Sequence, residues 1–253
     1  MRRILVTNDD GVHSPGIHAL AEALAPLGEV IVVAPLAEAS AIGHALTLRR
    51  PLRIEEFGEK RYAVDGTPTD CVNIALKILL GGQLPDLVAS GINKGYNLGD
   101  DVTYSGTVAG ALEGALLGLP ALAVSLGLGG KPGADFTHAA RIAGEVAQAL
   151  LARPLPPRTF LNVNIPPGTP RGYRTTVQGL RNHETTITAR VDPRGQGYYW
   201  IDELQCEWHE QPDSDYTAVR DGYVSVTPLQ PDLTDHEARR LVDGLPLPSR
   251  TGA

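Results

Sequence analysis

Cysteine is scarce in this sequence, with only Cys71 and Cys206 among 253 residues. The two lie far apart and in no Cys-x-x-Cys or Cys/His spacing, so neither a zinc site nor a disulfide framework is predicted. No apolar run approaches the roughly 18 residues that a membrane helix needs. The N-terminus, MRRI, lacks the apolar stretch and the cleavage site of a signal peptide. We therefore expect a cytoplasmic protein without a membrane partner.

An excess of basic residues is also missing. Lys and Arg number 22 against 29 Asp and Glu, which gives a net charge of -7 and a pI near 5.5. This balance disfavours binding to a nucleic-acid polymer, which requires a basic surface to neutralise phosphates. Small anionic substrates stay possible, because a local cation can override a mildly negative surface. The 42% of hydrophobic residues is enough to form a core.

Strand-like and helix-like segments alternate over the first two thirds of the chain. Apolar or β-branched runs predict strands, and apolar residues at helical spacing predict helices. The predicted strands are residues 3–7, 30–34, 52–57, 61–64, 87–90, 121–126 and 160–165, and the predicted helices are residues 16–27, 69–80, 107–117 and 136–151. This alternation predicts an α/β fold, a Rossmann-like three-layer sandwich with a mostly parallel sheet covered on both faces.

The last third of the chain changes character after the proline-rich segment 153–157. Residues 173–229 read as strands and turns, and residues 235–242 as a short terminal helix. We therefore divide the chain into an α/β core, residues 1–170, and a β-rich C-terminal extension, residues 171–253. From its residues alone the extension is either a subdomain or an arm used in assembly.

Two neighbouring carboxylates, Asp9 and Asp10, follow the first predicted strand in the sequence NDDG. Like charges side by side repel, and burying them is costly unless a cation is bound. Mg²⁺ and Mn²⁺ prefer such oxygen ligands, and Gly11 would allow a sharp turn there. A plain polar turn is the alternative, because Asn, Asp and Gly are common turn residues. The absence of GxGxxG excludes a dinucleotide fold, and adjacent rather than alternating aspartates disfavour an aspartyl-nucleophile phosphotransferase.

Polar residues also follow two other predicted strands. Ser40 comes after the second strand, and Asn93 after the strand at 87–90. Ligands of open α/β sheets bind beyond the carboxyl ends of the strands, so these side chains and the two aspartates could converge. A lone histidine in such a segment, like His44, is more often an ordinary loop residue than a catalytic one.

A long polar stretch runs from Ser90 to Gly114 and opens into a helix at Ser105-Gly106-Thr107. Helix N-termini present free N–H groups and the positive end of the helix dipole, so they bind phosphate. Ser105 or Thr107 would equally serve as a plain N-cap. A polar loop of this length inside a compact domain is usually functional.

Together these motifs resemble the survival-protein-E (SurE) family of metal-dependent nucleotide phosphatases. The resemblance covers about two thirds of the chain and is carried, in order, by NDDG with Ser14-Pro15-Gly16, by Ser40 and Thr47, by GTPTDCV at 66–72, by the stretch 90–114 and by NVNIP at 162–166. One departure is visible, because Ala41 stands where the family often has glycine after the loop serine.

The resemblance implies a 5′-nucleotidase that hydrolyses nucleoside monophosphates, with 3′-nucleotidase and short-chain polyphosphatase activity as further expectations. It implies one Mn²⁺ or Mg²⁺ ion per subunit, and self-association to a dimer or tetramer through the C-terminal extension. The residues it assigns are Asp9, Asp10, Ser40 and Asn93 to the metal, Asp9 and Asp10 also to catalysis, and Asn97, Ser105, Gly106 and Thr107 to phosphate.

Two other classes of function compete with this one. A nucleotide-binding module would keep the same pocket and lack turnover, but it would not need every metal ligand. A structural assembly protein built on the C-terminal extension would leave the acidic pair unexplained. Metal-dependent release of phosphate distinguishes the enzyme from both.

Overall fold

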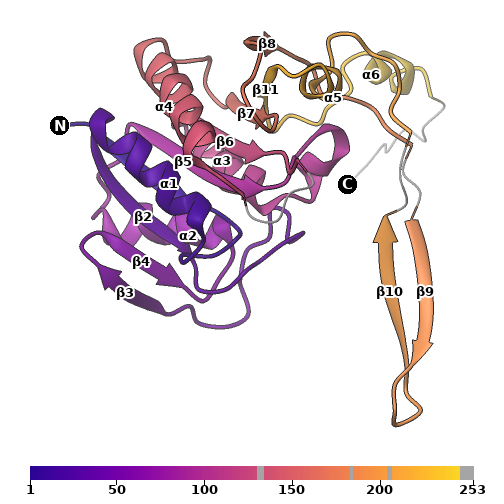
Figure 1. Ribbon diagram of the computed structural model, residues 1–253, viewed down its shortest axis with the longest axis horizontal. Helices are drawn as coiled ribbons and strands as arrows, with labels where there is room; N and C mark the ends of the chain where they lie inside the picture. Colours follow the sequence, from indigo (N-terminus) through magenta and orange to yellow (C-terminus); the bar gives the residue numbers. More distant parts are fainter. Residues whose placement is uncertain (130–133, 183–184, 204–206, 246–253) are drawn as a thin grey trace, which may run out of the picture.

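The computed structural model describes residues 1–129, 134–182, 185–203 and 207–245 (Figure 1). Cys206 and the end of the expected C-terminal extension lie outside these ranges. The strands are β1 (Arg3–Thr7), β2 (Glu29–Pro35), β3 (Ile54–Gly58), β4 (Arg61–Val64), β5 (Leu87–Lys94), β6 (Ala121–Leu126), β7 (Phe160–Ile165), β8 (Tyr173–Thr175), β9 (Thr185–Val191), β10 (Gly197–Glu203) and β11 (Val224–Leu229). The α-helices are α1 (Pro15–Leu24), α2 (Pro68–Ile74), α3 (Gly106–Leu116), α4 (Thr137–Ala152), α5 (Asp215–Arg220) and α6 (Ala238–Val242).

Nine strands form one sheet in the order β3-β4-β2-β1-β5-β6-β7-β11-β8. The six strands from β4 to β7 in this order pair in parallel, whereas β3 and β11 run antiparallel to β4 and β7. The central strands are short and buried on both faces, as parallel sheets require. The predicted α/β fold with a mostly parallel sheet is confirmed.

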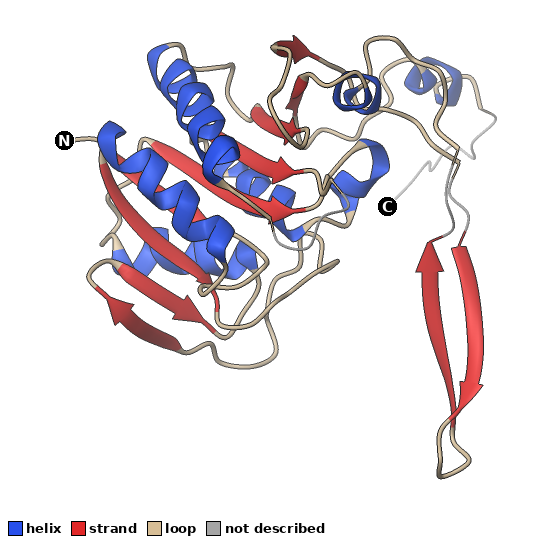
Figure 2. Ribbon diagram, in the orientation of Figure 1, coloured by secondary structure: helices blue, strands red, loops and turns tan. Residues whose placement is uncertain are grey.

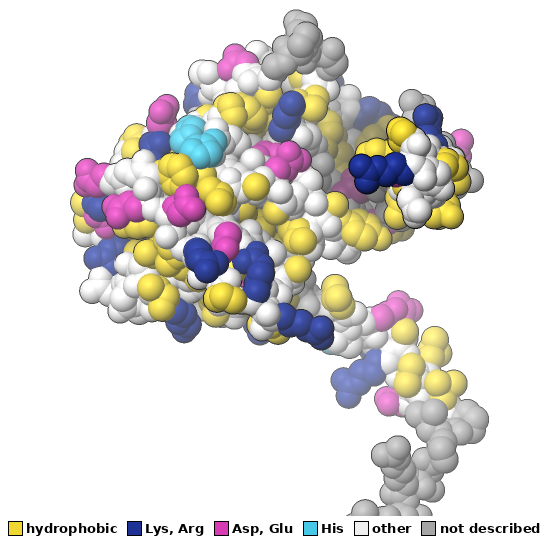
Figure 3. Space-filling model, turned by 90° about the horizontal axis from the view of Figure 1, so that it is seen from below, with side chains coloured by type: hydrophobic (Ala, Val, Ile, Leu, Met, Phe, Trp, Pro, Cys, Tyr) yellow, Lys and Arg dark blue, Asp and Glu magenta, His cyan; other side chains and the backbone are white. Residues whose placement is uncertain are grey.

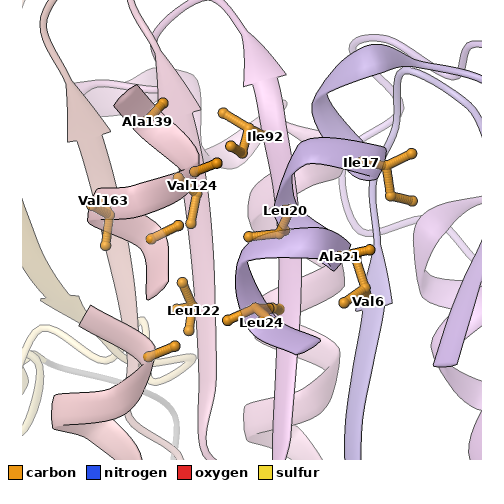
Figure 4. Packing of buried hydrophobic residues seen from close by; sticks show 14 of the residues in the cluster. Val6, Ile17, Leu20, Ala21, Leu24, Ile92, Leu122, Val124, Ala139 and Val163 are labelled. Carbon is orange, nitrogen blue, oxygen red and sulfur yellow. The ribbon is translucent and has the colours of Figure 1, made fainter. Parts of the chain in front are cut away.

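Helices cover both faces of this sheet (Figure 2). One core lies between the sheet and α1 with α4, where Leu20, Ile92 and Val124 pack together (Figure 4). The other lies between the sheet and α2 with α3, and it includes Leu5 and Cys71. Two apolar layers on opposite faces give the three-layer sandwich that the alternating sequence pattern predicts.

Helix starts follow capping rules that are visible in the sequence. Ser14 accepts a hydrogen bond from the Ile17 N–H at 3.4 Å, with Pro15 at the first helical position of α1. Thr67 and Asp70 form a capping box at the start of α2. Helix α2 ends earlier than expected, at Ile74, and continues as a π-helical segment, Ala75–Leu79. The predicted helix therefore exists but is not uniformly α-helical.

The stretch from Ser90 to Gly114 contains more regular structure than expected. Strand β5 continues to Lys94, so Asn93 lies in the last residues of the strand and does not follow it. A 3₁₀ helix, Gly99–Thr103, then precedes α3. The prediction of one long loop was wrong, because pairing of β5 with β6 resumes at Asn93 after a register shift.

The chain after residue 170 contributes both to the main sheet and to a separate feature. Strands β8 and β11 extend the sheet beyond β7, so the sheet does not end with the expected core. Strands β9 and β10 form an antiparallel hairpin of their own, which projects away from the sheet (Figure 1). The expected terminal helix is α6, which is shorter than expected.

Charged side chains are mixed on the face shown in Figure 3, where blue Lys and Arg are interspersed with magenta Asp and Glu. None of the described helices combines the length and the apolar character that crossing a bilayer requires.

Substituting Gly16 by Ala should destabilise the protein, because α1 approaches β5 very closely there. A Cβ atom at Gly16 would lie 2.1 Å from the carbonyl oxygen of Ile92, so the helix would have to shift. We expect a loss of about 1–3 kcal/mol in the free energy of unfolding, measured by urea denaturation. Gly197→Ala is the matched control, since nothing lies within 4 Å of its added Cβ and it should change stability little. Equal effects of the two substitutions would contradict the close approach.

Candidate active site

The turn after β1 places two carboxylates at the carboxyl end of the sheet. Asn8 closes this turn, because its Nδ2 donates to the Gly11 carbonyl at 3.0 Å and to Ser14 Oγ at 2.8 Å. Gly11 has a φ of 94°, in the left-handed region that glycine adopts most easily. As a result Asp9 is buried, at 5% exposure, while Asp10 is half-buried.

The Asp9 carboxylate lies against the N-terminus of α3. Thr107 donates its hydroxyl to Asp9 Oδ1. A Cβ atom at Gly106 would lie 2.7 Å from Asp9 Cβ and 2.9 Å from its Oδ2, so only glycine allows this approach. The positive end of the helix dipole partly compensates the carboxylate charge.

Burial nevertheless raises the pKa of both carboxyl groups. For Asp9 the loss of hydration has the largest effect, the hydrogen bond from Thr107 opposes it, and the charge of Asp10 adds to it. For Asp10 burial again has the largest effect, opposed by the Lys94 N–H. Neither aspartate forms an ion pair with a Lys or Arg side chain within the described ranges. The charge of Lys94 lowers the pKa of Asp10 without forming an ion pair with it, and no Lys or Arg side chain of the described residues pairs directly with the buried Asp9.

A cavity of about 390 Å³ opens above this pair. Six of the predicted site residues line it, namely Asp9, Asp10, Ser40, Asn93, Asn97 and Ser105. The other two, Gly106 and Thr107, lie directly against Asp9 and do not line the cavity. The structure thus brings together residues from four separate segments.

The donor atoms of this cavity suit a hard cation. Asn93 Nδ2 donates to the Gly95 carbonyl at 3.1 Å, which leaves the amide oxygen as its remaining polar atom. Ser40 Oγ donates to Glu38 Oε1 at 2.6 Å and keeps its oxygen lone pairs. No cluster of three or more His, Cys, Asp or Glu side chains suited to a metal occurs in the described part of the chain. Two carboxylates with neutral oxygen donors are nevertheless a set that Mg²⁺ and Mn²⁺ accept.

Helix α3 holds the segment that carries Ser40 in place through Glu113. His44 Nε2 lies 2.7 Å from Glu113 Oε2, and Asn73 donates to Glu113 Oε1 at 2.6 Å. Burial raises the pKa of Glu113, but these hydrogen bonds outweigh it and lower the net pKa. Ala41 adopts a φ of 53°, a conformation that costs an alanine roughly 1 kcal/mol relative to glycine.

Asn97 is held by a buried polar network. Its N–H donates to Asn164 Oδ1 at 2.9 Å and its Nδ2 to Ser125 Oγ at 2.7 Å, while Asn162 and Asn164 donate to its carbonyl. The NVNIP motif at 162–166 therefore positions the loop after β5 from two strands away.

Sequence reasoning missed five residues that also line the cavity, Glu38, Lys94, Tyr96, Asp101 and Tyr104. Lys94 brings a positive charge, and burial raises the pKa of Tyr96 to about 12, so its hydroxyl keeps its proton. Glu38 follows β2 as Ser40 does, so the rule that ligands bind beyond strand ends could have found it. The others stand inside the stretch 90–114 and carry no signal beyond that position.

Comparison with known proteins gives consistent matches. The family model described as survival protein SurE matches residues 4–185. A protein of Geotalea daltonii named "5'-nucleotidase SurE" is 52% identical over 239 residues, which cover 93% of this chain and 96% of that protein. One of the same name from Myxococcus xanthus is 53% identical over 93% of this chain and 90% of its own length. The crystal structure of the Sure protein from Aquifex aeolicus superposes with a TM-score of 0.84 at 43% identity, covering 95% of this chain and 98% of that one.

Asp9→Asn should stabilise the protein at neutral pH in the presence of a chelator, because it removes a buried charge. The folded-state pKa of Asp9 is raised, so the unfolded chain releases this proton first as the pH rises above the ordinary value of 3.8. The wild type therefore loses stability between this pH and the raised folded pKa, and the Asn variant does not. The stability difference should grow over that window and stay constant above it, as measured by urea denaturation at a series of pH values.

Asp65→Asn is the control of opposite sign for this experiment. The Arg53 N–H and the neighbouring Arg50 lower the pKa of this partly exposed carboxyl. Its replacement should cost stability at neutral pH, and the loss should fade as the pH falls. A pH-independent effect of Asp9→Asn would contradict the burial of a charge.

Proposed function

The chain belongs to the survival protein SurE family, and from this premise we propose that it is a divalent-cation-dependent 5′-nucleotidase. In this proposal it hydrolyses nucleoside monophosphates to nucleoside and phosphate. One observation supports it most strongly: Asp9 is buried without a Lys or Arg ion pair in the described structure, next to Asp10 and two neutral oxygen donors. The names of the relatives support the 5′-nucleotidase assignment.

Asp9, Asp10, Ser40 and Asn93 would hold the cation. A bound Mn²⁺ or Mg²⁺ would neutralise the charge of the phosphoryl oxygens and make the phosphorus easier to attack. The Thr107 hydroxyl keeps Asp9 in place for this role. The contact between His44 and Glu113 does the same for the segment that carries Ser40.

Phosphate would bind between the first turn of α3 and the loop after β5. Ser105 caps that helix at the cavity, with Gly106 next to it, while Lys94 at the end of β5 and Asn97 in the loop after it also line the cavity. Helix N-termini and a lysine side chain stabilise phosphoryl charge without a covalent intermediate. Water would attack the phosphorus, and the ester bond to the nucleoside oxygen would break. Asp10 is the carboxylate that solvent reaches more easily, since Asp9 is only 5% exposed, and we assign the orientation of the water to Asp10.

The proposal extends to 3′-nucleoside monophosphates and short-chain polyphosphate. All the contacts named above are made to the phosphoryl group, so none of them depends on which ribose oxygen carries it. A nucleotide-binding module with no turnover is the competing function, and it would bind nucleotide without metal and release no phosphate.

Chelation, or Asp9→Asn with Mn²⁺ present, should reduce phosphate release from 5′-nucleoside monophosphates on the order of 100-fold or more, because the transition-state charge loses its stabilisation. Calorimetric titration with Mn²⁺ should show that binding is lost in the same variant. Asp192→Asn, in the turn of the β9–β10 hairpin, is the matched control and should keep both activity and Mn²⁺ binding. Undiminished release after thorough chelation would contradict metal dependence, and no release with any metal would favour the binding module.

We also propose that the β9–β10 hairpin joins copies of this chain. Residues directly opposite in an antiparallel pair share a face, so Ile187, Ala189, Val191, Tyr199 and Ile201 form an apolar stretch on one face of the hairpin. The two isoleucines and Tyr199 are 64–72% exposed. An isolated two-stranded hairpin is at best marginally stable in water, so this face requires a partner.

Replacing Tyr199 and Ile201 together by Ser should dissociate the assembly, as measured by sedimentation equilibrium. The physical reason is the loss of apolar area at the contact between subunits. Arg190→Gln on the opposite face is the control and should leave the mass unchanged. A wild-type protein that sediments as a monomer would refute this assignment of the hairpin.

A further inference from the structure

A second cavity, of about 330 Å³, lies beside the one that holds the acidic pair. Tyr96 and Asp101 line both cavities, so the two adjoin at these residues. The rest of the second lining comes from Leu98 and from Trp208, Tyr216, Val219 and Arg220 in the C-terminal third. Its volume falls in the range of small-molecule sites, roughly 300–1,000 Å³.

The chemistry of this cavity differs from that of the first. Trp208 and Tyr216 stack with ring centroids 4.4 Å apart and planes 4° from parallel. The Arg220 guanidinium carbon lies 5.9 Å from the Tyr216 ring centroid, and that of Arg181 lies 5.6 Å from the Trp208 ring. Flat aromatic rings together with arginine are the groups on which nucleic-acid bases stack.

The two cavities are fixed relative to each other by the buried Asp215. Its carboxylate accepts hydrogen bonds from the Gly99 N–H at 2.9 Å, the Gly179 N–H at 3.0 Å and the Tyr216 N–H at 2.7 Å. Gly99 begins the 3₁₀ helix that lies between Asn97 and Ser105, and a Cβ atom there would lie 2.9 Å from the Trp208 ring. A ligand that spans both cavities would therefore meet groups that are already ordered, which lowers the entropy cost of binding.

We propose that this aromatic cavity is the base-binding subsite for the nucleotide substrate. The phosphate lies over Asp9 and Asp10, the ribose passes Tyr96, and the base stacks in the cavity of Trp208 and Tyr216. Purines gain more from this surface than pyrimidines, because the larger ring system has more stacking area. The inference rests on the proposed nucleotidase function, and it names the base as the part of the substrate that this cavity recognises.

Steady-state kinetics with 5′-AMP and with ribose 5-phosphate, which has no base, test the subsite. Trp208→Leu keeps an apolar side chain beside Gly99 but removes stacking. We expect it to lower the ratio of kcat/KM for 5′-AMP to that for ribose 5-phosphate on the order of tenfold, mainly through KM. Trp208→Phe keeps an aromatic ring and should restore most of the ratio. An unchanged ratio, or equal losses on both substrates, would show that Trp208 is only structural and would overturn the proposal.

Fluorescence gives a second readout that needs neither metal nor turnover. The chain has two tryptophans, so Trp200→Phe leaves Trp208 as the only one. In chelator, adenosine should quench this fluorescence with saturation, cytidine should do so more weakly, and ribose 5-phosphate should not. If no substrate is hydrolysed with any metal, the nucleotidase proposal fails and this titration alone decides the subsite. Absence of quenching by adenosine and by 5′-AMP would overturn the subsite even in an active enzyme.

Discussion

The burial of the Asp9 carboxylate against the N-terminus of α3 is the interaction on which the rest of the site depends. It requires the helix to approach the sheet unusually closely, and glycines make this possible along its whole length. A Cβ atom at Gly110 would lie 2.8 Å from Ser90 Oγ, and one at Gly114 would lie 2.8 Å from Val88 Cβ. The same helix holds the Ser40 segment through Glu113. One helix therefore fixes the Asp9 carboxylate and the loop that carries Ser40, and its own first turn lies at the cavity.

The burial of these carboxylates in the site lowers the stability of the folded protein. Desolvation raises the pKa of both aspartates, and a buried charge without an ion-pair partner opposes folding. Hydrogen bonds that hold the polar loops around the site compensate part of this loss of stability. Asn97 is held by Asn162 and Asn164 from β7, and Gly99 by Asp215 from α5. The C-terminal third thus supports the site as well as carrying the projecting hairpin.

Much of the fold was predictable because its elements follow local rules. Ser14 and the Thr67–Asp70 capping box mark helix starts, and the apolar runs at 4–6 in β1 and 121–124 in β6 mark buried parallel strands. The metal ligands proposed from the motifs were placeable because parallel strands end at one edge of the sheet. The structure departs from the prediction where pairing between strands outweighs the local sequence pattern. In β5 the residues around Asn93 have the composition of a loop, but they pair with β6.

The sequence by itself determined the α/β class, the acidic pair after β1, the helix start at Ser105 and the resemblance to a family, since each rests on residues close together in the chain. Only the tertiary structure decided that Glu38, Lys94 and Tyr96 share the cavity, and that Trp208 and Tyr216 lie beside it. Those two residues are more than 100 positions from Tyr96, and they reach it because Asp215 binds the Gly99 and Gly179 backbones. Contacts of that kind depend on packing between distant segments, which no local pattern of residues specifies.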